Sequence, residues 1–469
     1  MTTSKLLFRF GFLIETDAGS QLPEISQNWR MEEVYGVRVL IHFEQLFRIY
    51  KTGRGWAIEI GMCFAIGDRT VDQIVSDLIN DPEDCSPLDD LSGRFCLVVC
   101  NGSDPVVYND PFGSQTLFYT LRKTSCIASH AELLARYVDA DRMEDVRILL
   151  TTDGFKHLTV KYLPGNLSVY EDVFGLIPNH RYRLGTGLQE RYWPRSVVPK
   201  GVTLSDFELR CSVYFRSLAL ALKGKETFLG ITGGIDTRVV CAGLTRESHP
   251  FRGMTWLGNY FKANEQPIVD ELISRMGIRH DFVEVPGPDD EVARISGRNS
   301  GNFRGRSRLT SAIASGIQYG ENAIFVRGYG GEIIRGFYNL LRDPLTSFSP
   351  FEFQRIYAFK SRYAGPDPEF ERITLAAFHD FYSRGSYEDL MVRFDHDVND
   401  LFYWEQRMGM WAAAMHNEMD AAMYSITGLN DRRLFELAFA LQPSKRLTKK
   451  LFSSLVTKYD RRLDGVSIQ

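Results

Sequence analysis

The chain has 469 residues, of which 44% are hydrophobic and 24% charged, and its formal net charge is −4. This composition is typical of a globular protein with more than one core, and it predicts neither a nucleic-acid partner nor binding to an acidic membrane. No apolar run reaches the ~18 residues of a membrane-spanning helix. The cysteines form no CxxC pair and no Cys/His metal spacing, which favours a reducing, cytoplasmic compartment. They stand at positions 63, 85, 96, 100, 126, 211 and 241.

Residues 1–198 are expected to form a β-rich first domain. The early segment LLFRFGFLIE, 6–15, contains Arg9 and lacks a cleavage pattern, so we expect a strand there and no signal peptide. The polar stretch 195–206 marks the expected boundary. Further strands are predicted at 93–101, 105–110 and 115–120, and a proline-rich crossing with a hairpin at 162–194.

Residues 199–469 are expected to form a second domain in which strands alternate with helices. This alternation is typical of a parallel sheet with helices on both faces. From about residue 350 onward the chain is expected to be mainly helical and is rich in aromatic residues. The predicted strands are 227–232, 251–257, 280–285 and 323–328, and the predicted helices between them include 259–276 and 308–320.

The stretch FLGITGGIDTRVVCAGL, 228–244, takes a strand through two glycines into a helix. Such a turn exposes backbone N–H groups at the positive end of the helix dipole, and glycine lets an anion approach closely. Thr232 and Thr237 add hydroxyl groups, and Asp236 adds a carboxylate that suits Mg²⁺. The glycines are explained equally well by a tight strand–helix connection without a ligand. No Gly-Lys-Ser/Thr follows, so the turn is not a Walker loop.

Three segments resemble the asparagine synthetase family. TGGIDT, 232–237, is similar to the family's Ser-Gly-Gly-x-Asp-Ser pyrophosphate loop, with Thr at both ends. FVRGYGGEIIRGFY, 325–338, resembles its later Gly-x-Gly-Ser-Asp-Glu loop, and 91–120 resembles the end of its glutaminase-like domain. The resemblance implies an N-terminal glutaminase-like αββα sandwich of the Ntn type and a C-terminal PP-loop ATP pyrophosphatase domain with a helical extension.

The resemblance also implies a site for ATP and Mg²⁺. Asp236 and Glu332 would hold the metal, although Glu332 stands where the family has Asp, and its extra methylene shifts the carboxylate. Glu265 resembles an acid that follows the family's second strand, but an exposed helix start explains it as well. The residues that match the family's nucleotide-binding positions are Gly230, Thr232, Gly233, Gly234, Asp236, Thr237, Met254, Thr255 and Gly328.

Glutamine-hydrolysing members of the family use an N-terminal cysteine as nucleophile. This chain begins Met-Thr-Thr, and its first cysteine is Cys63. Thr2 offers a nucleophile of the same type, but FGFLIE rather than TTSK resembles the family's first strand, so Thr2 would lie upstream of the site. We therefore expect a first domain without glutaminase activity.

The loop GYGGEI resembles the Gly-Tyr-Gly-Ser-Asp-Ile loop of the β-lactam and carbapenam synthetase branch. There the tyrosine works with a glutamate in an Asn-Glu-Met segment, and HNEMDAAM, 416–423, offers Glu418. A phenol held by a carboxylate can relay a proton from an incoming ammonium, so Tyr329 and Glu418 are predicted as a catalytic dyad. A core tyrosine and a helix-surface glutamate are the alternative.

The family's Arg-Pro-Lys segment, whose lysine stabilises the adenylate, has no match before Gln469. Lys449 is predicted to replace that lysine, with Lys450 and Lys458 as further candidates, although solvated helix faces also explain all three.

The sequence therefore predicts an ATP-dependent synthetase that adenylates a carboxylate, releases pyrophosphate and couples the acid to an amine. Its partners would be a carboxylic acid and an amine, or one molecule carrying both, with no nucleic acid or membrane; a homo-oligomer is left open. The alternatives are a glutamine- or ammonia-dependent amidotransferase and a non-catalytic nucleotide-binding scaffold.

Overall fold

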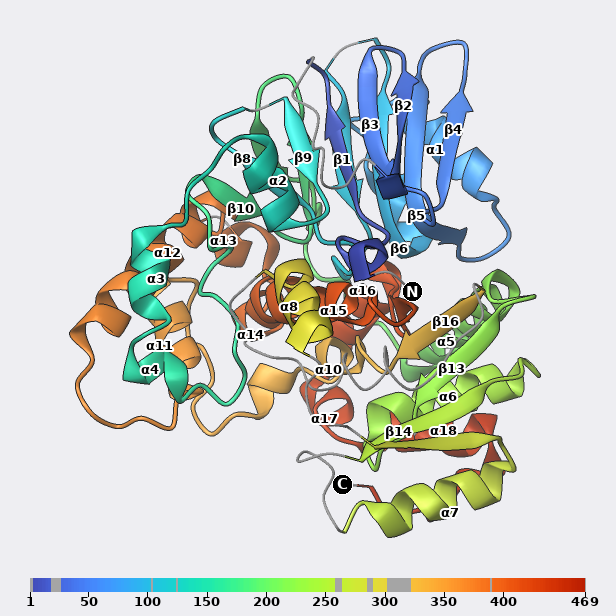
Figure 1. Cartoon of the computed structure of the whole chain (residues 1–469). Coiled ribbons are helices and arrows are strands. Elements are labelled where there is room, and N and C mark those ends of the chain that lie inside the picture. The colour runs from blue at the N-terminus through green and yellow to red at the C-terminus, as the bar shows by residue number, and fades with distance from the viewer. Residues whose placement is uncertain are drawn as a thin grey trace.

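The computed structural model describes residues 3–17, 27–102, 104–123, 125–257, 264–284, 290–301, 322–388 and 390–468. Thr2 and the predicted helix 308–320 lie outside these ranges. The described chain is a mixed α/β structure with two antiparallel sheets and one parallel sheet. Figure 1 shows the antiparallel sheets at the top and the parallel sheet below them on the right. The predicted division into 1–198 and 199–469 stays a prediction.

The two antiparallel sheets each contain six strands. The first has the order β10-β8-β9-β1-β3-β2 and the second β12-β11-β7-β6-β5-β4. The first sheet consists of β1 (Phe12–Glu15), β2 (Trp29–Val34), β3 (Val37–His42), β8 (Phe118–Thr120), β9 (Cys126–Ala128) and β10 (Val173–Gly175). The second consists of β4 (Phe47–Lys51), β5 (Trp56–Ala65), β6 (Leu91–Cys100), β7 (Val106–Asn109), β11 (His180–Arg183) and β12 (Leu188–Arg191).

These sheets pack face to face because both carry apolar side chains at alternate positions. Phe12 and Ile14 of β1 join Ile58 and Val98 of the second sheet in one buried cluster. Leu13 points the other way, into the core beneath α2 (Ala131–Tyr137), as the two-residue period of a strand requires. Helix α1 (Val71–Asn80) covers the second sheet, so the layers follow the αββα order that the resemblance implied.

The prediction of a strand over 6–15 is mostly wrong. Within this segment only β1 is a strand, whereas η1 (Thr3–Leu6) is a 3₁₀ helix. Phe8 and Phe10 lie between them with φ of 49° and 57°, which breaks any strand pairing. Both are buried, and the Phe8 N–H donates to Asn299 Oδ1 at 2.8 Å. The apolar residues of this segment recur because they are buried in an interface, and not because the whole segment forms a strand.

The parallel sheet has the order β15-β14-β13-β16-β17, and all its neighbouring strands run parallel. One face packs on α5 (Leu204–Ala221), α6 (Ile235–Arg246) and α18 (Lys450–Tyr459), and the other on Met419 and Met423, so both faces are covered as predicted. The strands are β13 (Glu226–Gly230), β14 (Arg252–Leu257), β15 (His280–Glu284), β16 (Ala323–Arg327) and β17 (Tyr424–Thr427). Of the helices, α5 (Leu204–Ala221), α6 (Ile235–Arg246), α7 (Gln266–Met276) and α8 (Asp290–Asn299) accompany them.

The chain beyond residue 350 is mainly helical as predicted, but it returns once to the parallel sheet as β17. Helices α3, α4, α11 and α12 form a lobe on the left of Figure 1. None of the described helices combines the length and apolar character that a membrane crossing requires.

The remaining helices before residue 350 are η3 (Ser86–Asp90), α3 (Glu144–Leu149), α4 (Asp153–Lys156), α10 (Gly331–Ile334) and η4 (Phe337–Leu340). The later ones are α11 (Pro350–Phe359), α12 (Pro368–Arg384), α13 (Leu390–Phe394), α14 (Val398–Phe402), the π-helix η5 (Tyr403–Ala412), α15 (Ala413–Met419), α16 (Arg432–Ala440), α17 (Pro443–Arg446), α18 (Lys450–Tyr459) and η6 (Arg461–Leu463).

A buried polar network joins the sandwich to the helical region. Arg94 of β6 donates to both carboxylate oxygens of Asp420 at 2.6 Å and to Asn417 Oδ1 at 3.0 Å. Arg94 is 1% exposed and Asp420 is fully buried. Asn430 donates to Gly93 O and to Asp110 Oδ1. The two parts therefore share a tightly constrained interface.

Asp420→Asn should leave the Arg94 guanidinium buried without its counter-charge. Removing one partner of a buried ion pair costs about 3–5 kcal/mol. We expect a clear fall in the midpoint of chemical denaturation. The control is Asp145→Asn, which breaks the surface pair Arg372–Asp145 and should change stability by about 0–1 kcal/mol. Equal midpoints for both variants would show that the interface does not depend on the Arg94–Asp420 pair.

Candidate functional site

Strands β13 and β16 lie side by side at the centre of the parallel sheet, and the chain leaves them in opposite directions. From β13 it runs to β14 on one side, and from β16 to β17 on the other. The carboxyl ends of two such strands form the crevice in which open α/β sheets bind ligands. The glycine turn follows β13, and the Tyr329 loop follows β16 (Figure 1). The sheet thus brings together the two motifs that the sequence had placed far apart.

The glycine turn spans the end of β13 and the start of α6, with Gly234 as the N-cap. The Gly233 N–H donates to Glu265 Oε1 at 2.9 Å, and the Gly234 N–H donates to Thr232 Oγ1 at 3.2 Å. A carboxylate therefore sits where a phosphate oxygen would bind, which agrees with the preference of a helix start for anions. A phosphate would have to displace Glu265.

Asp236 in the first turn of α6 faces the loop after β16. Arg335 donates to both of its carboxylate oxygens, at 2.9 Å from Nε and 2.6 Å from Nη2. A Cβ on Gly331 would overlap Asp236 Oδ1, and a Cβ on Gly328 would lie 2.5 Å from Thr237 Oγ1. Only glycine at these two positions lets the loops approach so closely.

Glu332 lies beside Asp236, and its Oε2 is buried without a hydrogen-bond partner among the described residues. Burial, reinforced by the negative charge of Asp236, raises the pKa of Glu332 from 4.5 to about 8. Two hard oxygen donors next to a phosphate site suit Mg²⁺, which usually binds one or two carboxylates together with phosphates. The described residues contain no cluster of three or more His, Cys, Asp or Glu side chains that could hold a metal. Asp236 and Glu332 fit Mg²⁺ only if phosphate oxygens complete the coordination shell of the ion. Arg335 would also have to release the Asp236 carboxylate or share it with the ion.

Three of the predicted nucleotide-binding positions, Gly230, Met254 and Thr255, are those that the family resemblance assigns to adenine, and they are part of the strand ladder. Ile231 N donates to Met254 O at 2.8 Å, and Thr255 Oγ1 donates to Ile231 O at 2.7 Å. Thr255 Oγ1 also lies 2.9 Å from His280 Nε2. A Cβ on Gly230 would contact the rings of Phe325 and Trp256. A role of Gly230, Met254 and Thr255 toward adenine stays a prediction.

Tyr329 is half-buried within a group of aromatic rings. Its ring stacks on Phe112 of the sandwich at 6.2 Å and 4°, and it lies 6.1 Å from Trp411 and 6.0 Å from His416. Its hydroxyl accepts a hydrogen bond from Arg327 Nη1 at 3.3 Å.

The Tyr329 hydroxyl is paired with Arg327, and within HNEMDAAM the ring of His416 lies against Tyr329. Glu418 follows two residues later on α15 and is buried. These contacts do not test the predicted pairing of Tyr329 with Glu418. The dyad therefore stays a prediction.

Lys449 is the N-cap residue of α18 and is exposed. Phe452, one turn later, lies 6.0 Å beneath the guanidinium of Arg335, which brings the start of α18 toward the site. Lys458 forms an ion pair with Glu208 on α5 instead. Lys449 and Lys450 therefore lie at the end of α18 that carries Phe452, whereas Lys458 is held at α5.

Four residues near the motifs were not predicted from the sequence: Arg335, Phe112, Trp411, and Arg407, whose guanidinium lies 5.0 Å from the Trp411 ring. The arginine of GGEIIRG, three residues after Glu332, was a usable signal for Arg335, because residues three apart on a helix are neighbours. Nothing local marks Phe112 or Arg407, since their proximity to the site depends on pairing between distant elements.

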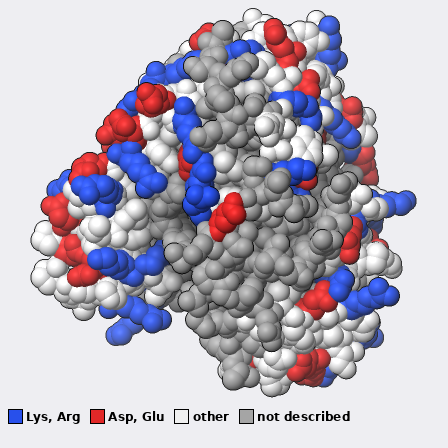
Figure 2. Space-filling model, in the orientation of Figure 1, with Lys and Arg blue, Asp and Glu red and all other residues white. Residues whose placement is uncertain are grey.

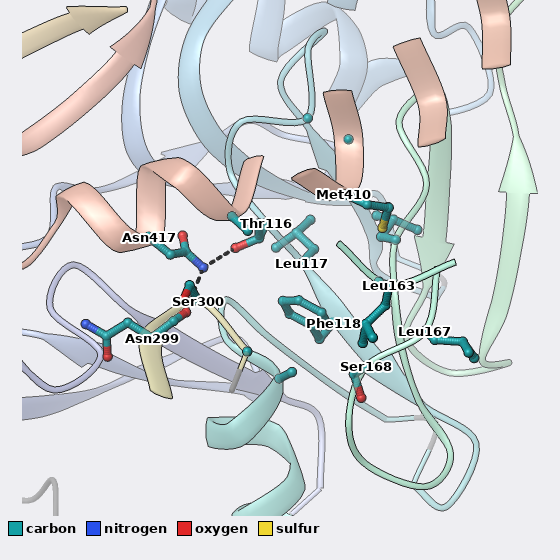
Figure 3. Close-up of a pocket in the computed structure, with 17 residues that line it drawn as sticks. Thr116, Leu117, Phe118, Leu163, Leu167, Ser168, Asn299, Ser300, Met410 and Asn417 are labelled. Carbon is teal, nitrogen blue, oxygen red and sulfur yellow. Dashed lines mark hydrogen bonds between the residues drawn. The ribbon is translucent and has the colours of Figure 1, made fainter. Parts of the chain in front are cut away.

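A separate cavity of about 40 Å³ lies between the sandwich and the helices. This volume holds only a few water molecules. Figure 3 shows Asn417 of α15 bridging Thr116 Oγ1 at 2.8 Å and Asn299 O at 3.4 Å on one side, with Phe118 and Met410 across the cavity. Figure 2 shows basic and acidic side chains interspersed over the described part of the visible face, without a large patch of one sign.

No protein family model and no curated protein matches the chain. Among solved structures, NMN synthetase from Francisella tularensis is 11% identical with a TM-score of 0.22, covering 44% of this chain and 94% of that one. Glutamine-dependent NAD⁺ synthetase from Acinetobacter baumannii, in complex with ADP, is 12% identical with a TM-score of 0.17, covering 35% and 39%. Glutamine PRPP amidotransferase from B. subtilis, complexed with ADP and GMP, is 13% identical with a TM-score of 0.23, covering 71% and 72%. TM-scores of this size do not support an inference of function.

The raised pKa of Glu332 predicts a specific pH dependence of stability. The folded state retains a proton that the unfolded state releases near 4.5, so stability should fall as the pH rises from about 4.5 to about 8. In metal-free buffer, Glu332→Gln should flatten this slope and raise the melting temperature at pH 8 relative to the unmodified chain.

The control is Glu352→Gln, because Arg355 lowers the pKa of Glu352 and its effect should be confined to acidic pH. Thermal unfolding followed across this pH range measures all three proteins. Parallel pH profiles for the unmodified chain and Glu332→Gln would contradict a Glu332 that stays protonated in the folded state.

Proposed function

We propose that this chain is an ATP-dependent synthetase that activates a carboxylic acid as an acyl adenylate and couples it to an amine. The observation that carries the proposal is the meeting of the glycine turn, Asp236, Glu332 and Tyr329 at the central carboxyl ends of a parallel sheet. The resemblance to the asparagine synthetase family, in its β-lactam-synthetase-like branch, supports the same chemistry.

In this proposal the turn from Thr232 to Thr237 binds the phosphates of ATP. Its backbone N–H groups and the start of α6 favour negative charge. Asp236 and Glu332 would hold Mg²⁺, which neutralises phosphate charge as the α-phosphorus is attacked. Arg335 already supplies a positive charge at the same place and would turn toward the phosphates when Asp236 takes the metal.

The second step needs a group that removes a proton from the amine. Tyr329 is our candidate, because its hydroxyl is held by Arg327 and its ring is fixed by Phe112. Arg327 is always protonated and cannot take up the proton that the phenol relays, so the step needs a carboxylate as acceptor, and Glu418 is the residue to test. Lys449 is the proposed counterpart of the family's adenylate-stabilising lysine.

One observation favours a second candidate, a nucleotide-binding scaffold without catalysis. The Glu265 carboxylate already accepts a hydrogen bond from the Gly233 N–H, and Arg335 already neutralises Asp236. These groups of the turn therefore have partners without ATP. The amidotransferase alternative requires a nucleophile in the first domain. Cys63 is poorly suited, because burial raises its pKa well above the ordinary value and Glu59 adds to the shift. Release of glutamate from glutamine would favour that alternative.

Asp236→Asn should reduce Mg·ATP-dependent pyrophosphate release by at least about 10²-fold, because it removes the charge that holds the metal on the phosphates. The assay supplies ATP with a panel of carboxylic acids. Asp281→Asn is the matched control, since it breaks a similar Arg–Asp pair, Arg252–Asp281, outside the site. Equal rates of pyrophosphate release for the unmodified chain and Asp236→Asn would show that this turn is not the ATP site. A chain that binds ATP but releases no pyrophosphate would support the alternative of a non-catalytic scaffold.

Tyr329→Phe should separate the two chemical steps. The variant keeps the ring that packs on Phe112 and loses only the hydroxyl, so exchange of labelled pyrophosphate into ATP should continue. Amide formation should fall by about 10²–10⁴-fold, the usual contribution of a positioned acid–base group.

Glu418→Gln tests the dyad in the same assays. If Glu418 takes part, amide formation should fall in this variant while pyrophosphate exchange continues. Tyr50→Phe is the control, because it deletes a hydroxyl that is hydrogen-bonded to Glu59 in the sandwich. An equal loss of exchange and amide formation in Tyr329→Phe would mean that the ring only shapes the pocket.

A further inference from the structure

Arg238 is the fourth residue of α6, directly after the glycine turn, and its side chain is almost completely buried. The residue is 3% exposed. Its Nη1 donates to Val466 O at 2.8 Å, and its Nη2 donates to Ser467 O at 2.7 Å and to Gly233 O at 3.4 Å. One guanidinium therefore connects the glycine turn with a segment that lies 228 residues later in the chain.

All three acceptors of Arg238 are backbone carbonyl oxygens. Arg238 forms no ion pair with any described residue, and its Nε is buried without a partner in the described structure. Glu271 on α7 pairs with Arg275 instead. By contrast, the buried guanidiniums of Arg94 and Arg446 each pair with a carboxylate. Since a guanidinium is always charged, a positive charge without a described counter-charge remains behind the glycine turn.

The contact with Gly233 O determines which way the peptide between Gly233 and Gly234 faces. The carbonyl and the N–H of a trans peptide point in opposite directions. Because Arg238 holds the carbonyl on the buried side, the Gly234 N–H faces away from the guanidinium, toward Thr232 Oγ1. Two successive glycines restrict rotation very little, so without a partner this peptide could turn its carbonyl outward. An outward carbonyl oxygen would repel an anion at the turn.

The segment 464–467, which supplies two of the acceptors, is itself fixed. Arg275 of α7 donates to Arg462 O at 3.0 Å and to Asp464 O at 2.7 Å. Val466 is 5% exposed and belongs to the main hydrophobic core. The segment therefore presents its carbonyl groups from a constant position, and the guanidinium that binds them has little freedom to move.

We propose that Arg238 is a positioning residue for pyrophosphate at the glycine turn, and that segment 464–467 fixes it in this role. The guanidinium would act without touching the phosphates. It keeps the Gly233 carbonyl turned inward, so that the N–H groups of the turn are preorganised for an anion, and it adds a positive charge behind them. This inference rests on the proposed function and deepens it, because segment 464–467 becomes part of the phosphate site.

The alternative is that Arg238 only attaches segment 464–467 to α6. Arg275 provides the matched comparison, because it attaches the same part of the chain to α7 through two carbonyl groups. None of its described hydrogen bonds is to the glycine turn. A structural role would therefore give both arginines similar effects, whereas a positioning role would give only Arg238 an effect on anion binding.

The probes are Mg·pyrophosphate and Mg·ATP, and titration calorimetry measures their binding to the full chain at a temperature at which circular dichroism shows each variant folded. Arg238→Met should bind pyrophosphate at least tenfold more weakly than the unmodified chain, because it loses both the charge and the restraint on the peptide. Arg238→Lys keeps the charge but lacks the planar fork that reaches carbonyls on two segments, so it should recover only part of the affinity. Arg275→Met should bind pyrophosphate as the unmodified chain does.

The dependence of the pyrophosphate affinity on KCl concentration supplies a readout that loss of packing would not change. Salt screens the attraction between a cation and the bound anion. The affinity should therefore fall less steeply with KCl in Arg238→Met than in the unmodified chain. Arg238→Lys and Arg275→Met should retain the steeper dependence.

Deletion of residues 465–469 tests the segment separately, because it removes two of the three acceptors of Arg238. The shortened chain should bind pyrophosphate several-fold more weakly. Adding Arg238→Met to the deletion should weaken binding no further than Arg238→Met alone, since both changes act through the same contact. Tighter binding by the shortened chain would mean that the segment opposes the ligand, and it would overturn the proposal.

Equal pyrophosphate affinities of the unmodified chain and Arg238→Met, or equal losses in Arg238→Met and Arg275→Met, would also overturn the proposal while leaving the synthetase in place. An unmodified chain that binds neither pyrophosphate nor ATP would overturn both. Pyrophosphate binding that depends on Arg238, in a chain that never releases pyrophosphate from ATP, would retain the positioning role and reject the synthetase.

Discussion

The bidentate ion pair between Arg335 and Asp236 holds the proposed site together. Asp236 belongs to the first turn of α6, and Arg335 follows the short helix α10 after β16. The pair therefore ties the two loops that flank the central strands of the parallel sheet. It keeps Glu332 close to a second carboxylate, whose charge adds to the effect of burial in raising the pKa of Glu332. Any metal or phosphate at the turn must compete with this pair.

The antiparallel sandwich contributes directly to the site. Its loop after β7 is fixed by Asp110, which accepts hydrogen bonds from Ser114, Gln115 and Asn430. This loop presents Phe112 to Tyr329. The sandwich therefore packs directly against Tyr329. Asn430 binds both the Phe112 N–H and the Gly93 carbonyl, which is next to Arg94, so a substitution in this buried network can disturb Tyr329.

The sequence predicted what depends on local pattern and missed what depends on distant pairing. Strands β13 to β16 are apolar runs bounded by turn residues, so their bounds differ from the prediction by two residues or fewer. Strand β17 was missed because four residues after a helix carry no periodic signal, and only pairing with β16 makes them a strand. Asp236 and Glu332 could be named from their motifs. That Arg335 would neutralise Asp236, and that His416 would lie against Tyr329, follows only from the packing of elements more than 80 residues apart.

The distribution of unsatisfied groups is the strongest physical reason to place function here. Buried polar atoms are normally hydrogen-bonded, because each exception costs stability. Glu332, next to Asp236, and Trp411, next to Tyr329, each carry a buried polar atom without a partner in the described structure, as do residues elsewhere such as Asn109 and Thr448. Packing alone does not explain a carboxyl group at this position, since an apolar residue of the same size would stabilise the fold more. A polar site of this kind is where a fold gives up stability for function.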